Sequence, residues 1–546
     1  VSNYSDFTIS LFRNMTTNNI PLPVITSVAP LSSTIGSTIT IRGKNFNPVI
    51  SNNIVFFGST SATVTGASST TLTVTVPYGA NYQYISVTDL STRLMAYSNN
   101  PVVVIYPTPL SSFNQFAAAM SIPVANPWQT TIKDFNNDGK PDIVVGTNTG
   151  LYLLTNATTT TTAIIFTTQS VTLSLNIHAL VSDDLDGDGN PDLALYNGTN
   201  DQLLIYKNAS ISGGSISFSN TGIALATTTA GIFYSAVISD IDMDGRPDII
   251  LAGNSDTAVN IFRNTSISGT INFTTLPALS QITTGAAANT LAVGDIDGDG
   301  KPDLVTGNSS SSNISVLWNT STGPGNITFA SPINFNTASN SFGGVSLGDF
   351  NGDGKLDIAS ANYSTNTVSV LLNAGRSGTI DASSFVVGNA LSLIGAPGGN
   401  SQGVAIGDIN GDGKPDIVSS SYSTPVMSVF INTSTSTLSP AFSGYTAYPT
   451  NTSSTDNVGN IISLADFNGD GMLDALATNM GNGLSIFRNL INTPPIFITD
   501  FNPKQGTITP TTIVTITGGG FSDVAASNMV FFGATSATII GASSTT

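Results

Sequence analysis

Seven copies of one nine-residue pattern gather the oxygen-bearing side chains of this 546-residue chain. Each copy carries Asp or Asn at positions 1, 3 and 5, Gly at position 6 and Asp at position 9. The copies begin at Asp134, Asp184, Asp240, Asp295, Asp349, Asp408 and Asp466. Side-chain oxygens at this spacing, with the backbone carbonyl of position 7, suit a hard cation that takes six or more oxygens at roughly 2.3–2.6 Å. The pattern predicts up to seven calcium sites.

The acidic residues support this prediction. All 33 are Asp, and 24 of them lie in the seven loops. Carboxylates packed this closely repel one another unless a cation offsets their charge. The net charge of −18 is therefore mostly a signature of metal sites, and 15 Lys and Arg without a basic patch argue against a nucleic-acid partner. A solvated Asx-rich turn is the alternative for a single loop, but seven copies in register argue against it.

The composition predicts an all-β protein. Only 9% of the residues are charged and Glu is absent, while Gly and the small polar residues are abundant, which disfavours helices and suits strands and turns. The absence of Cys excludes disulfides, and the single His argues against zinc sites. The sequence contains no run of 18 apolar residues that could span a bilayer. Weak calcium loops would stay empty in the cytosol, so we expect an extracellular protein, at the cell surface or secreted.

The loops recur at the period of a propeller blade. Successive copies are separated by 50, 56, 55, 54, 59 and 58 residues. An apolar strand precedes each loop, a second follows it, a third ends in Asn, as in Ile261–Asn264, and a fourth carries one Phe, such as Phe273. Four antiparallel strands per period predict a seven-bladed β-propeller. The last period lacks a fourth strand, so we expect Ser111–Met120, with Phe113, to supply it and close the ring.

The regions outside the loops indicate a larger repeat. Short alternating strands before the propeller predict an immunoglobulin-like β-sandwich. Residues 541–546 are identical to residues 66–71, and residues 486–489 resemble residues 11–14 at the same shift of 475. We therefore expect a segment of a tandem array, divided into the end of a preceding blade (1–19), a sandwich (20–107), a seven-bladed propeller (108–493) and the start of a second, truncated sandwich (494–546).

The seven loops resemble integrin-type FG-GAP and VCBS repeats. Residues 20–107 and 494–546 resemble IPT/TIG immunoglobulin-like domains, through Pro30, Gly43–Phe46 and Phe57–Gly58. The resemblance implies a propeller that binds each calcium ion between the first and second strands of a blade. Proteins with these parts in tandem are similar to large bacterial surface adhesins and extracellular fibres.

Carried over to this sequence, the resemblance implies ligands from every loop. The side-chain ligands are Asp134, Asn136, Asp138 and Asp142; Asp184, Asp186, Asp188 and Asp192; Asp240, Asp242, Asp244 and Asp248; Asp295, Asp297, Asp299 and Asp303; Asp349, Asn351, Asp353 and Asp357; Asp408, Asn410, Asp412 and Asp416; Asp466, Asn468, Asp470 and Asp474. The carbonyl ligands belong to Lys140, Asn190, Arg246, Lys301, Lys355, Lys414 and Met472. Asn at position 3 lowers the ligand charge of four loops, and we expect this to weaken those sites.

Other residues invite functional readings that the sequence does not favour. His178 could act as a ligand, but a packed or channel-lining role is commoner. Trp128 and Trp318 could stack on a sugar, although tryptophans in strands more often pack. Sequons at the ends of third strands favour turn chemistry over glycosylation of an exposed rim; they begin at Asn156, Asn208, Asn264, Asn319 and Asn432. The fixed loops argue against Asp pairs acting as acid and base, and we predict no catalytic residue and no enzyme.

The sequence leads to two functional hypotheses. The first is an extracellular structural and adhesive repeat protein, a calcium-stabilised fibre or stalk whose partners are neighbouring repeats or identical subunits. The second is a propeller that recognises a cell-surface glycan or protein. Since all seven loops lie within residues 108–493, we expect calcium removal to destabilise the propeller and to leave residues 22–106 nearly unaffected.

Overall fold

The computed structural model describes residues 22–104 and 116–490 apart from short gaps, and a few pairs and strands beyond them. The gaps are 34–35, 59, 78–79, 81–83, 220–221, 228–230, 254–258, 268, 277–286, 341–343, 389, 394–400, 423–425, 435–439, 451–457 and 480–482. Beyond these ranges it describes 2–3, 8–9, 497–502, 514–519, 530–532 and 535–537. The predicted blade strand at residues 11–14 therefore lies outside the described residues.

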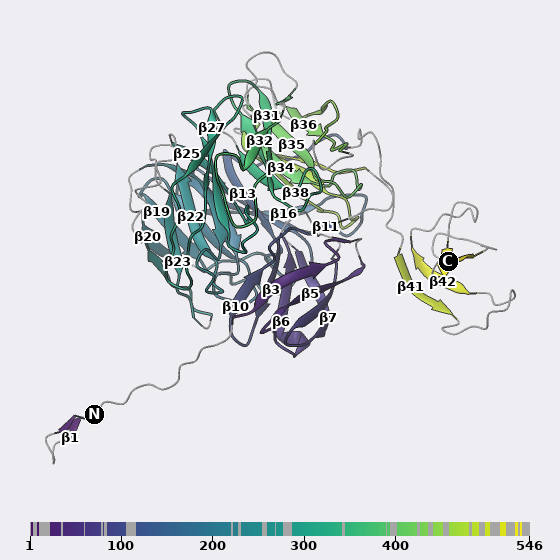
Figure 1. Cartoon of the computed structure of the whole chain (residues 1–546), viewed down its shortest axis with the longest axis horizontal. Helices are drawn as coiled ribbons and strands as arrows, with labels where there is room; N and C mark the ends of the chain where they lie inside the picture. Colours follow the sequence, from purple (N-terminus) through teal and green to yellow (C-terminus); the bar gives the residue numbers. More distant parts are fainter. Residues whose placement is uncertain are drawn as a thin grey trace.

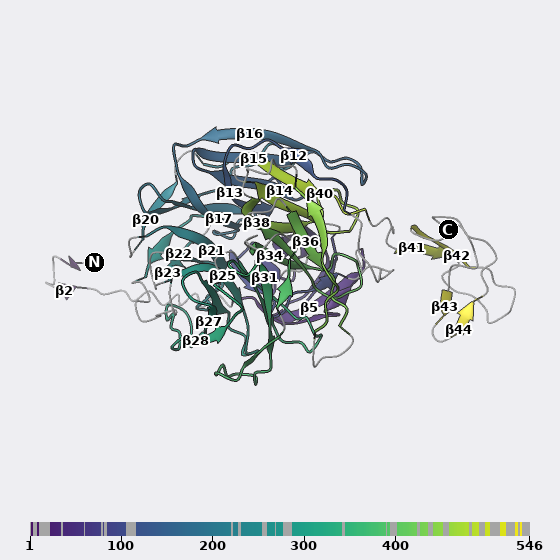
Figure 2. The ribbon, with the colours of Figure 1, turned by 90° about the horizontal axis from the view of Figure 1, so that it is seen from above.

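Seven antiparallel sheets form the propeller, as the repeat predicts, six of them with four described strands and one with five, and Figure 2 shows them arranged around a common centre. Blades 1 to 3 consist of β13 (Pro127–Lys133), β14 (Asp142–Thr147), β15 (Gly150–Asn156) and β16 (Phe166–Thr172); β17 (Ile177–Asp183), β18 (Asp192–Asn197), β19 (Gln202–Tyr206) and β20 (Ile223–Ala226); β21 (Phe233–Ser239), β22 (Asp248–Gly253), β23 (Asn260–Asn264) and β24 (Phe273–Thr275). Blades 4 and 5 consist of β25 (Ala288–Gly294), β26 (Asp303–Asn308), β27 (Asn313–Leu317) and β28 (Ile333–Asn336); β29 (Val345–Gly348), β30 (Asp357–Asn362), β31 (Thr367–Asn373) and β32 (Phe385–Val387), with β33 (Leu391–Ser392) also on β31.

Blades 6 and 7 complete the ring. They consist of β34 (Ser401–Gly407), β35 (Asp416–Ser421), β36 (Val426–Phe430) and β37 (Thr446–Pro449); β38 (Val458–Ala465), β39 (Asp474–Asn479), β40 (Gly483–Phe487) and β12 (Met120–Ile122). The second strand of every blade is buried along its whole length, because neighbouring blades cover both of its faces. This explains why these strands read as nearly continuous small and apolar runs.

An N-terminal strand closes the propeller. Antiparallel pairing joins β12 to β40, and a bridge joins Phe116 to Asn489. The fourth-strand Phe of each other blade also pairs with the Asn that ends or follows the third strand, as Phe218 does with Asn208. The equivalent residue in blade 7 is therefore Phe116. The closure is as predicted, but Phe113 was the wrong landmark, and it lies outside the described residues.

The sandwich folds through one strand that belongs to both of its layers. Its strands are β3 (Val24–Ala29), β4 (Ser32–Ser33), β5 (Thr38–Lys44), β6 (Asn53–Phe57), β7 (Thr60–Ala67), β8 (Thr71–Thr75), β9 (Ile85–Asp89), β10 (Leu94–Tyr97) and β11 (Val103–Val104), with a 3-10 helix at Ile50–Asn52. The first half of β7 pairs with β6 and its second half with β8. Alternate apolar residues such as Ile39, Ile41 and Phe57 fill the space between the layers.

The C-terminal region adds two antiparallel pairs, β41 (Phe497–Asn502) with β42 (Thr515–Gly519) and β43 (Val530–Phe532) with β44 (Thr535–Ala537). At the other end of the chain, β1 (Ser2–Asn3) pairs with β2 (Thr8–Ile9). The domain boundaries at 19, 107 and 493 stay predictions.

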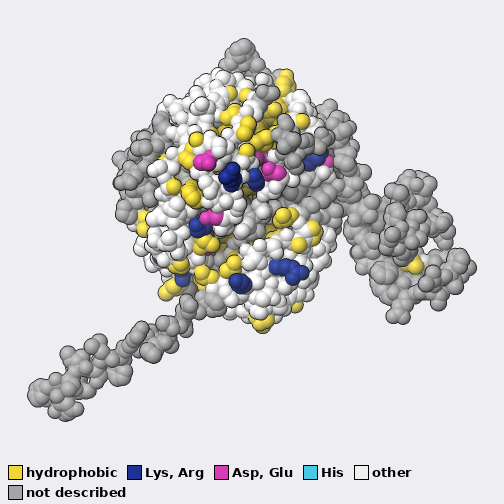
Figure 3. Space-filling view, in the orientation of Figure 1, with side chains coloured by type: hydrophobic (Ala, Val, Ile, Leu, Met, Phe, Trp, Pro, Cys, Tyr) yellow, Lys and Arg dark blue, Asp and Glu magenta, His cyan; other side chains and the backbone are white. Residues whose placement is uncertain are grey.

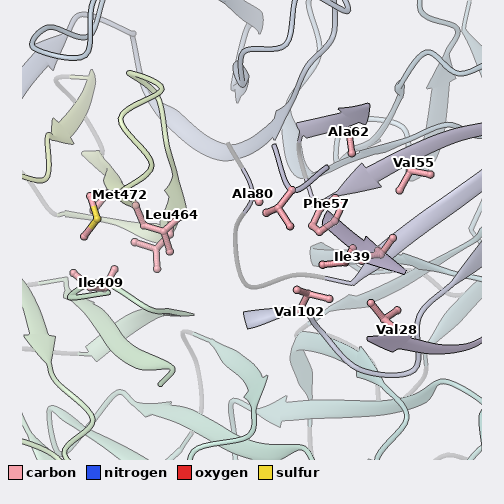
Figure 4. Close-up of a cluster of buried hydrophobic side chains, with 14 of the residues drawn as sticks. Val28, Ile39, Val55, Phe57, Ala62, Ala80, Val102, Ile409, Leu464 and Met472 are labelled. Carbon is pink, nitrogen blue, oxygen red and sulfur yellow. The ribbon is translucent and has the colours of Figure 1, made fainter. Parts of the chain in front are cut away.

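The sandwich rests against the propeller (Figure 1). Its hydrogen bonds to loops 2 and 3 place it at the end that carries the Asp loops. Arg93 donates a hydrogen bond to the Gly187 carbonyl of loop 2 at 3.2 Å, and the Met95 N–H donates to the Gly245 carbonyl of loop 3 at 2.7 Å. The Tyr97 hydroxyl donates to Asp183 at 2.9 Å. One apolar cluster contains residues of both domains, among them Val102 of the sandwich and Leu464 of blade 7 (Figure 4). The two domains thus share a core, and between the sandwich and the inner strands lies a cavity of about 850 Å³.

Candidate metal centres

Each Asp loop connects the first strand of a blade to the second, where the resemblance placed it. The position-6 glycine has a left-handed φ between 82° and 91° in all seven loops. Its N–H donates to Oδ2 of the position-1 Asp at 2.7–3.0 Å, which turns that carboxylate into the loop. The seven glycines are Gly139, Gly189, Gly245, Gly300, Gly354, Gly413 and Gly471. A side chain at this φ would strain the turn.

The position-9 Asp anchors the far end of each loop. It begins the second strand and is fully buried in every blade. Its Oδ2 accepts the N–H of position 2 at 2.8–3.1 Å. Its Oδ1 accepts the N–H of the Asn after the third strand at 2.7–2.8 Å. Each oxygen keeps a second lone pair that can bind a cation.

Burial makes the ionised form of these carboxylates costly without a cation. Burial raises the pKa of Asp142 to about 7 and the pKa of Asp303 and Asp357 to about 8, although backbone N–H donors oppose the shift. Burial likewise raises the pKa of Asp134 at position 1 to about 6 and, with the charge of Asp188, the pKa of Asp184 to about 8. Two or three negative charges confined to a buried loop need a positive partner.

Three loops bring carboxylate oxygens close enough to share one ion. The oxygens of each cluster lie within 4.8 Å of one another. The clusters are Asp184, Asp186 and Asp192; Asp240, Asp242 and Asp248; Asp295, Asp297 and Asp299. Three buried oxygens in these loops have no hydrogen-bond partner within the described part of the chain: Asp242 Oδ1, Asp295 Oδ1 and Asp297 Oδ2. Such oxygens fit a metal ion, which supplies the missing positive charge.

The loops with Asn at position 3 keep the same geometry. Oδ1 of Asn136, Asn351, Asn410 and Asn468 accepts the position-5 N–H at 3.0–3.2 Å, as Asp186 and Asp297 do in loops 2 and 4. The Asn136 amide donates to the Gly214 carbonyl at 2.7 Å, so its oxygen stays directed into the loop. The position-7 N–H donates to the position-5 carboxylate in all seven loops at 2.9–3.0 Å. Metal binding by the position-7 carbonyls stays a prediction.

All three four-Asp loops contact a basic side chain of the chain itself, and in loop 4 this is Lys301, whose Nζ lies 2.8 Å from Asp299. Lys207 Nζ donates to Asp186 and lies 3.0 Å from Asp188 in loop 2. Arg263 lies 2.5 Å from Asp242 and 2.6 Å from Asp244 in loop 3, where Arg246 also reaches Asp244. Figure 3 shows Lys and Arg beside Asp on an otherwise sparsely charged face. The equivalent residue in loop 4 is Trp318, which lies beside Asp297; burial raises the pKa of that Asp and the indole opposes the shift.

The Asn residues at the ends of the third strands have a structural role that the sequence reading missed. The side-chain amide donates one hydrogen bond to the position-8 carbonyl of its own loop, at 2.9–3.2 Å. It donates a second to the position-2 carbonyl of the preceding loop, at 2.8–3.0 Å. These bridging asparagines are Asn156, Asn208, Asn264, Asn319, Asn373, Asn432 and Asn489. Asn156 binds the Phe467 carbonyl, so the network runs around the closed ring.

The same bonds bear on whether the sequon asparagines are structural or glycosylated. The five sequon asparagines are buried, and both amide hydrogens of each are donated to carbonyls. A glycan on that nitrogen would replace one of the two hydrogens, remove one bond and have to enter a buried position. The residue two positions later caps the turn, as Ser210 does by accepting the Ser217 N–H. These bonds favour a structural role of the asparagines over glycosylation, which stays untested.

Comparison with known proteins agrees with this architecture. The model of the FG-GAP-like repeat matches residues 134–195, 184–251, 240–306, 295–360, 349–419 and 408–477, and the chain belongs to this family. The IPT/TIG domain model matches residues 23–104 and 495–546. No curated protein matches the chain. The protein is thus an FG-GAP propeller flanked by IPT/TIG domains.

Solved structures resemble the chain only distantly. A lectin from Agrocybe aegerita that recognises non-reducing terminal N-acetylglucosamine is 18% identical, with 65% of this chain and 86% of the lectin covered and a TM-score of 0.41. An auxiliary nutrient binding protein from Bacteroides ovatus is 10% identical, with 85% and 97% covered and a TM-score of 0.32. Their functions are not carried over to this chain.

Proposed function

We propose that this chain is a unit of an extracellular structural and adhesive repeat protein, in which propellers alternate with IPT/TIG domains in a calcium-stabilised fibre or stalk. The contact between the sandwich and the loop end of the propeller carries this proposal. Arg93 and Met95 bind backbone carbonyls of loops 2 and 3, so the metal loops form part of the junction. A shared core and direct bonds favour a stiff connection over a flexible tether.

Calcium is the cation that the donor set favours. All the side-chain donors are carboxylate or amide oxygens, with no sulfur or imidazole, and hard cations prefer such ligands. When bound, calcium would neutralise the buried carboxylates and hold the two ends of each loop together. Position 9 is already fixed by two backbone donors, which supports a structural role and argues against its use as a catalytic base.

The order of the domains supports assembly into an array. IPT/TIG matches lie on both sides of the propeller, and the sequence repeats at a shift of 475 residues. We propose neighbouring repeats or identical subunits as the partners. Within the described residues no helix is long and apolar enough to cross a membrane.

Calcium chelation tests this proposal. In millimolar calcium we expect one compact sandwich–propeller body by small-angle scattering, and in chelator a lower Tm and a more extended particle. A single site at a hundredfold excess of ligand over Kd contributes about 2.7 kcal/mol. Because the sandwich contacts loops 2 and 3, we now expect its docking to weaken as well, which revises the sequence-based expectation for residues 22–106.

The control distinguishes the effect of losing calcium from the effect of weakening the contact between the sandwich and the propeller. Arg93→Ala removes a junction bond without touching a proposed ligand, so it should loosen the sandwich in calcium while the calcium-dependent gain in Tm persists. Equal melting and equal scattering with and without chelator would contradict the proposal.

A further inference from the structure

The innermost strands share an irregularity near their first residues. The pairing with the second strand shifts between Pro127 and Gln129, Ile177 and Ala179, Phe233 and Ser235, and Ala288 and Thr290. A longer shift in blade 6 lies between Ser401 and Val404. A β-bulge of this kind re-aims the extra side chain. The residues within the four one-residue shifts, together with Gln402 from the longer one, are here called the bulge residues: Trp128, His178, Tyr234, Asn289 and Gln402.

Three bulge residues form an aromatic arc across blades 1 to 3. The Trp128 and His178 rings have centroids 5.1 Å apart with planes at 68°, and those of His178 and Tyr234 are 5.4 Å apart at 89°. Gln129 donates from blade 1 to the Tyr234 carbonyl of blade 3 at 2.9 Å. A bond that joins blades 1 and 3 directly places the first residues of these strands near the propeller axis. These residues lie at the opposite end of the strands from the Asp loops.

Two bulge residues bury polar atoms that form no hydrogen bond with the described residues. His178 is 6% exposed and Gln402 is 2% exposed. His178 Nδ1 and Gln402 Oε1 have no hydrogen-bond partner among the described residues. Aliphatic side chains would pack at these places without the cost of an unpaired polar atom. The central cavity is lined by Thr130 and Val404, each two residues along the strand from a bulge residue.

We propose that the bulge residues form a binding site for a neutral saccharide unit. Aromatic rings suit the C–H face of a pyranose, while imidazole and amide groups can bond its hydroxyls. None of the five carries a formal charge at neutral pH, since burial lowers the pKa of His178, and this disfavours a charged ligand. The arc is edge-to-face and offers no pair of parallel rings for a planar base. This site goes beyond the structural role and does not depend on it.

The two tryptophans of the chain make the test selective. Trp128 is a bulge residue, whereas Trp318 lies at loop 4. In the Trp318→Phe protein, Trp128 is the one remaining tryptophan, so the tryptophan fluorescence reports on the bulge residues. We would titrate this protein in millimolar calcium with the methyl glycosides of glucose, galactose, mannose and N-acetylglucosamine, and with glycerol as the control solute. A saturable change with at least one glycoside at millimolar concentration, absent with glycerol, is the expected result.

Second variants localise the binding. Gln402→Leu and His178→Phe keep side-chain bulk and remove the unpaired polar atoms, and each should weaken binding roughly tenfold, the change expected from about one lost hydrogen bond. Gln169→Leu, on the exposed outer strand β16, should leave it unchanged. The proposal is overturned if no glycoside changes the emission, or if both variants bind as the parent does. Failure here leaves the chelation experiment unaffected, so the two proposals fail separately.

Discussion

Loops 2 and 3 differ from loops 1, 5, 6 and 7 in how they balance charge. The first pair has Asp at position 3, and Lys207 or Arg263 lies over its carboxylates. The other four have Asn at position 3, and loops 1, 5 and 6 carry an uncharged residue at the place of Lys207, namely Thr155, Leu372 and Ile431. Loop 7 is the exception, because Arg488 occupies that place. Burial raises the pKa of Asp470 in this loop, and the charge of Arg488 opposes the shift.

The comparison teaches that Asn at position 3 need not mark a weak site. In loops 2 and 3 a metal ion must share its carboxylates with an ammonium or guanidinium group, or displace it. In loops 1, 5 and 6 one carboxylate is missing, but no basic side chain occupies the equivalent place. We therefore expect the two groups to differ less in calcium affinity than their carboxylate counts suggest.

A change of pH acts on all the loops at once and should have the largest effect. Burial raises the pKa of Asp303 and Asp357 to about 8, far above the ordinary value of 3.8. Between these values the folded chain binds more protons than the unfolded chain, so without metal its stability falls as the pH rises. Calcium competes with these protons, so the calcium-dependent gain in Tm should grow over the same window. Melting curves from roughly pH 5 to pH 8, with calcium or chelator, check this; a gain that shrinks with rising pH would contradict it.

Removal of the position-9 carboxylate should be the most damaging substitution in any loop, whether position 3 is Asp, as in loop 4, or Asn, as in loop 5. Asp303→Ala leaves the N–H groups of Ile296 and Asn319 without their acceptor, and Asp357→Ala does the same to Phe350 and Asn373. Two buried unpaired donors cost about 4 kcal/mol together. We expect the two variants to lose similar amounts of stability in urea denaturation, and to lose more in calcium than in chelator because each also lacks a proposed ligand, whereas Asp297→Asn, the control in loop 4, should cost little in chelator. Unequal losses for Asp303→Ala and Asp357→Ala would show that loops with Asp and loops with Asn at position 3 do not share a framework.

The bridging asparagines should contribute without regard to metal. Asn319→Ala removes the donor to the Ile241 and Pro302 carbonyls and so unlinks loops 3 and 4. The expected loss is about 2 kcal/mol, equal in calcium and in chelator. Asn373→Ala, which unlinks loops 4 and 5, is the matched change. A loss that appears only in calcium would mean that these residues act through the metal sites.

The sequence predicted most of what repeats within a blade. The loop, the strands on either side and the Asn after the third strand recur at nearly constant spacing. Seven copies therefore identify strands that a single copy would leave uncertain. The closing strand was placed three residues early, because Phe113 and Phe116 both fit the spacing and only the bridge to Asn489 separates them. The bridging bonds were missed because each joins residues of neighbouring blades, as Asn319 joins Ile241. The docking of the sandwich could not be predicted, because it depends on single contacts, such as Arg93 to Gly187, that do not recur along the sequence.

The smallest expected effect concerns the basic residue that distinguishes loop 2. Lys207→Met removes the charge that faces Asp186 and Asp188. Because the ammonium group is partly exposed, the loss of stability in chelator should be under about 1 kcal/mol. In calcium the variant lacks a competitor for the same carboxylates, so its calcium-dependent gain in Tm should exceed that of the parent. Leu372→Met, at the equivalent place in loop 5, changes no charge and should leave the gain unaltered. A smaller gain in Lys207→Met would mean that the ammonium group assists the metal site, and the contrast between the two groups of loops would then be one of cooperation with the ion rather than competition for its ligands.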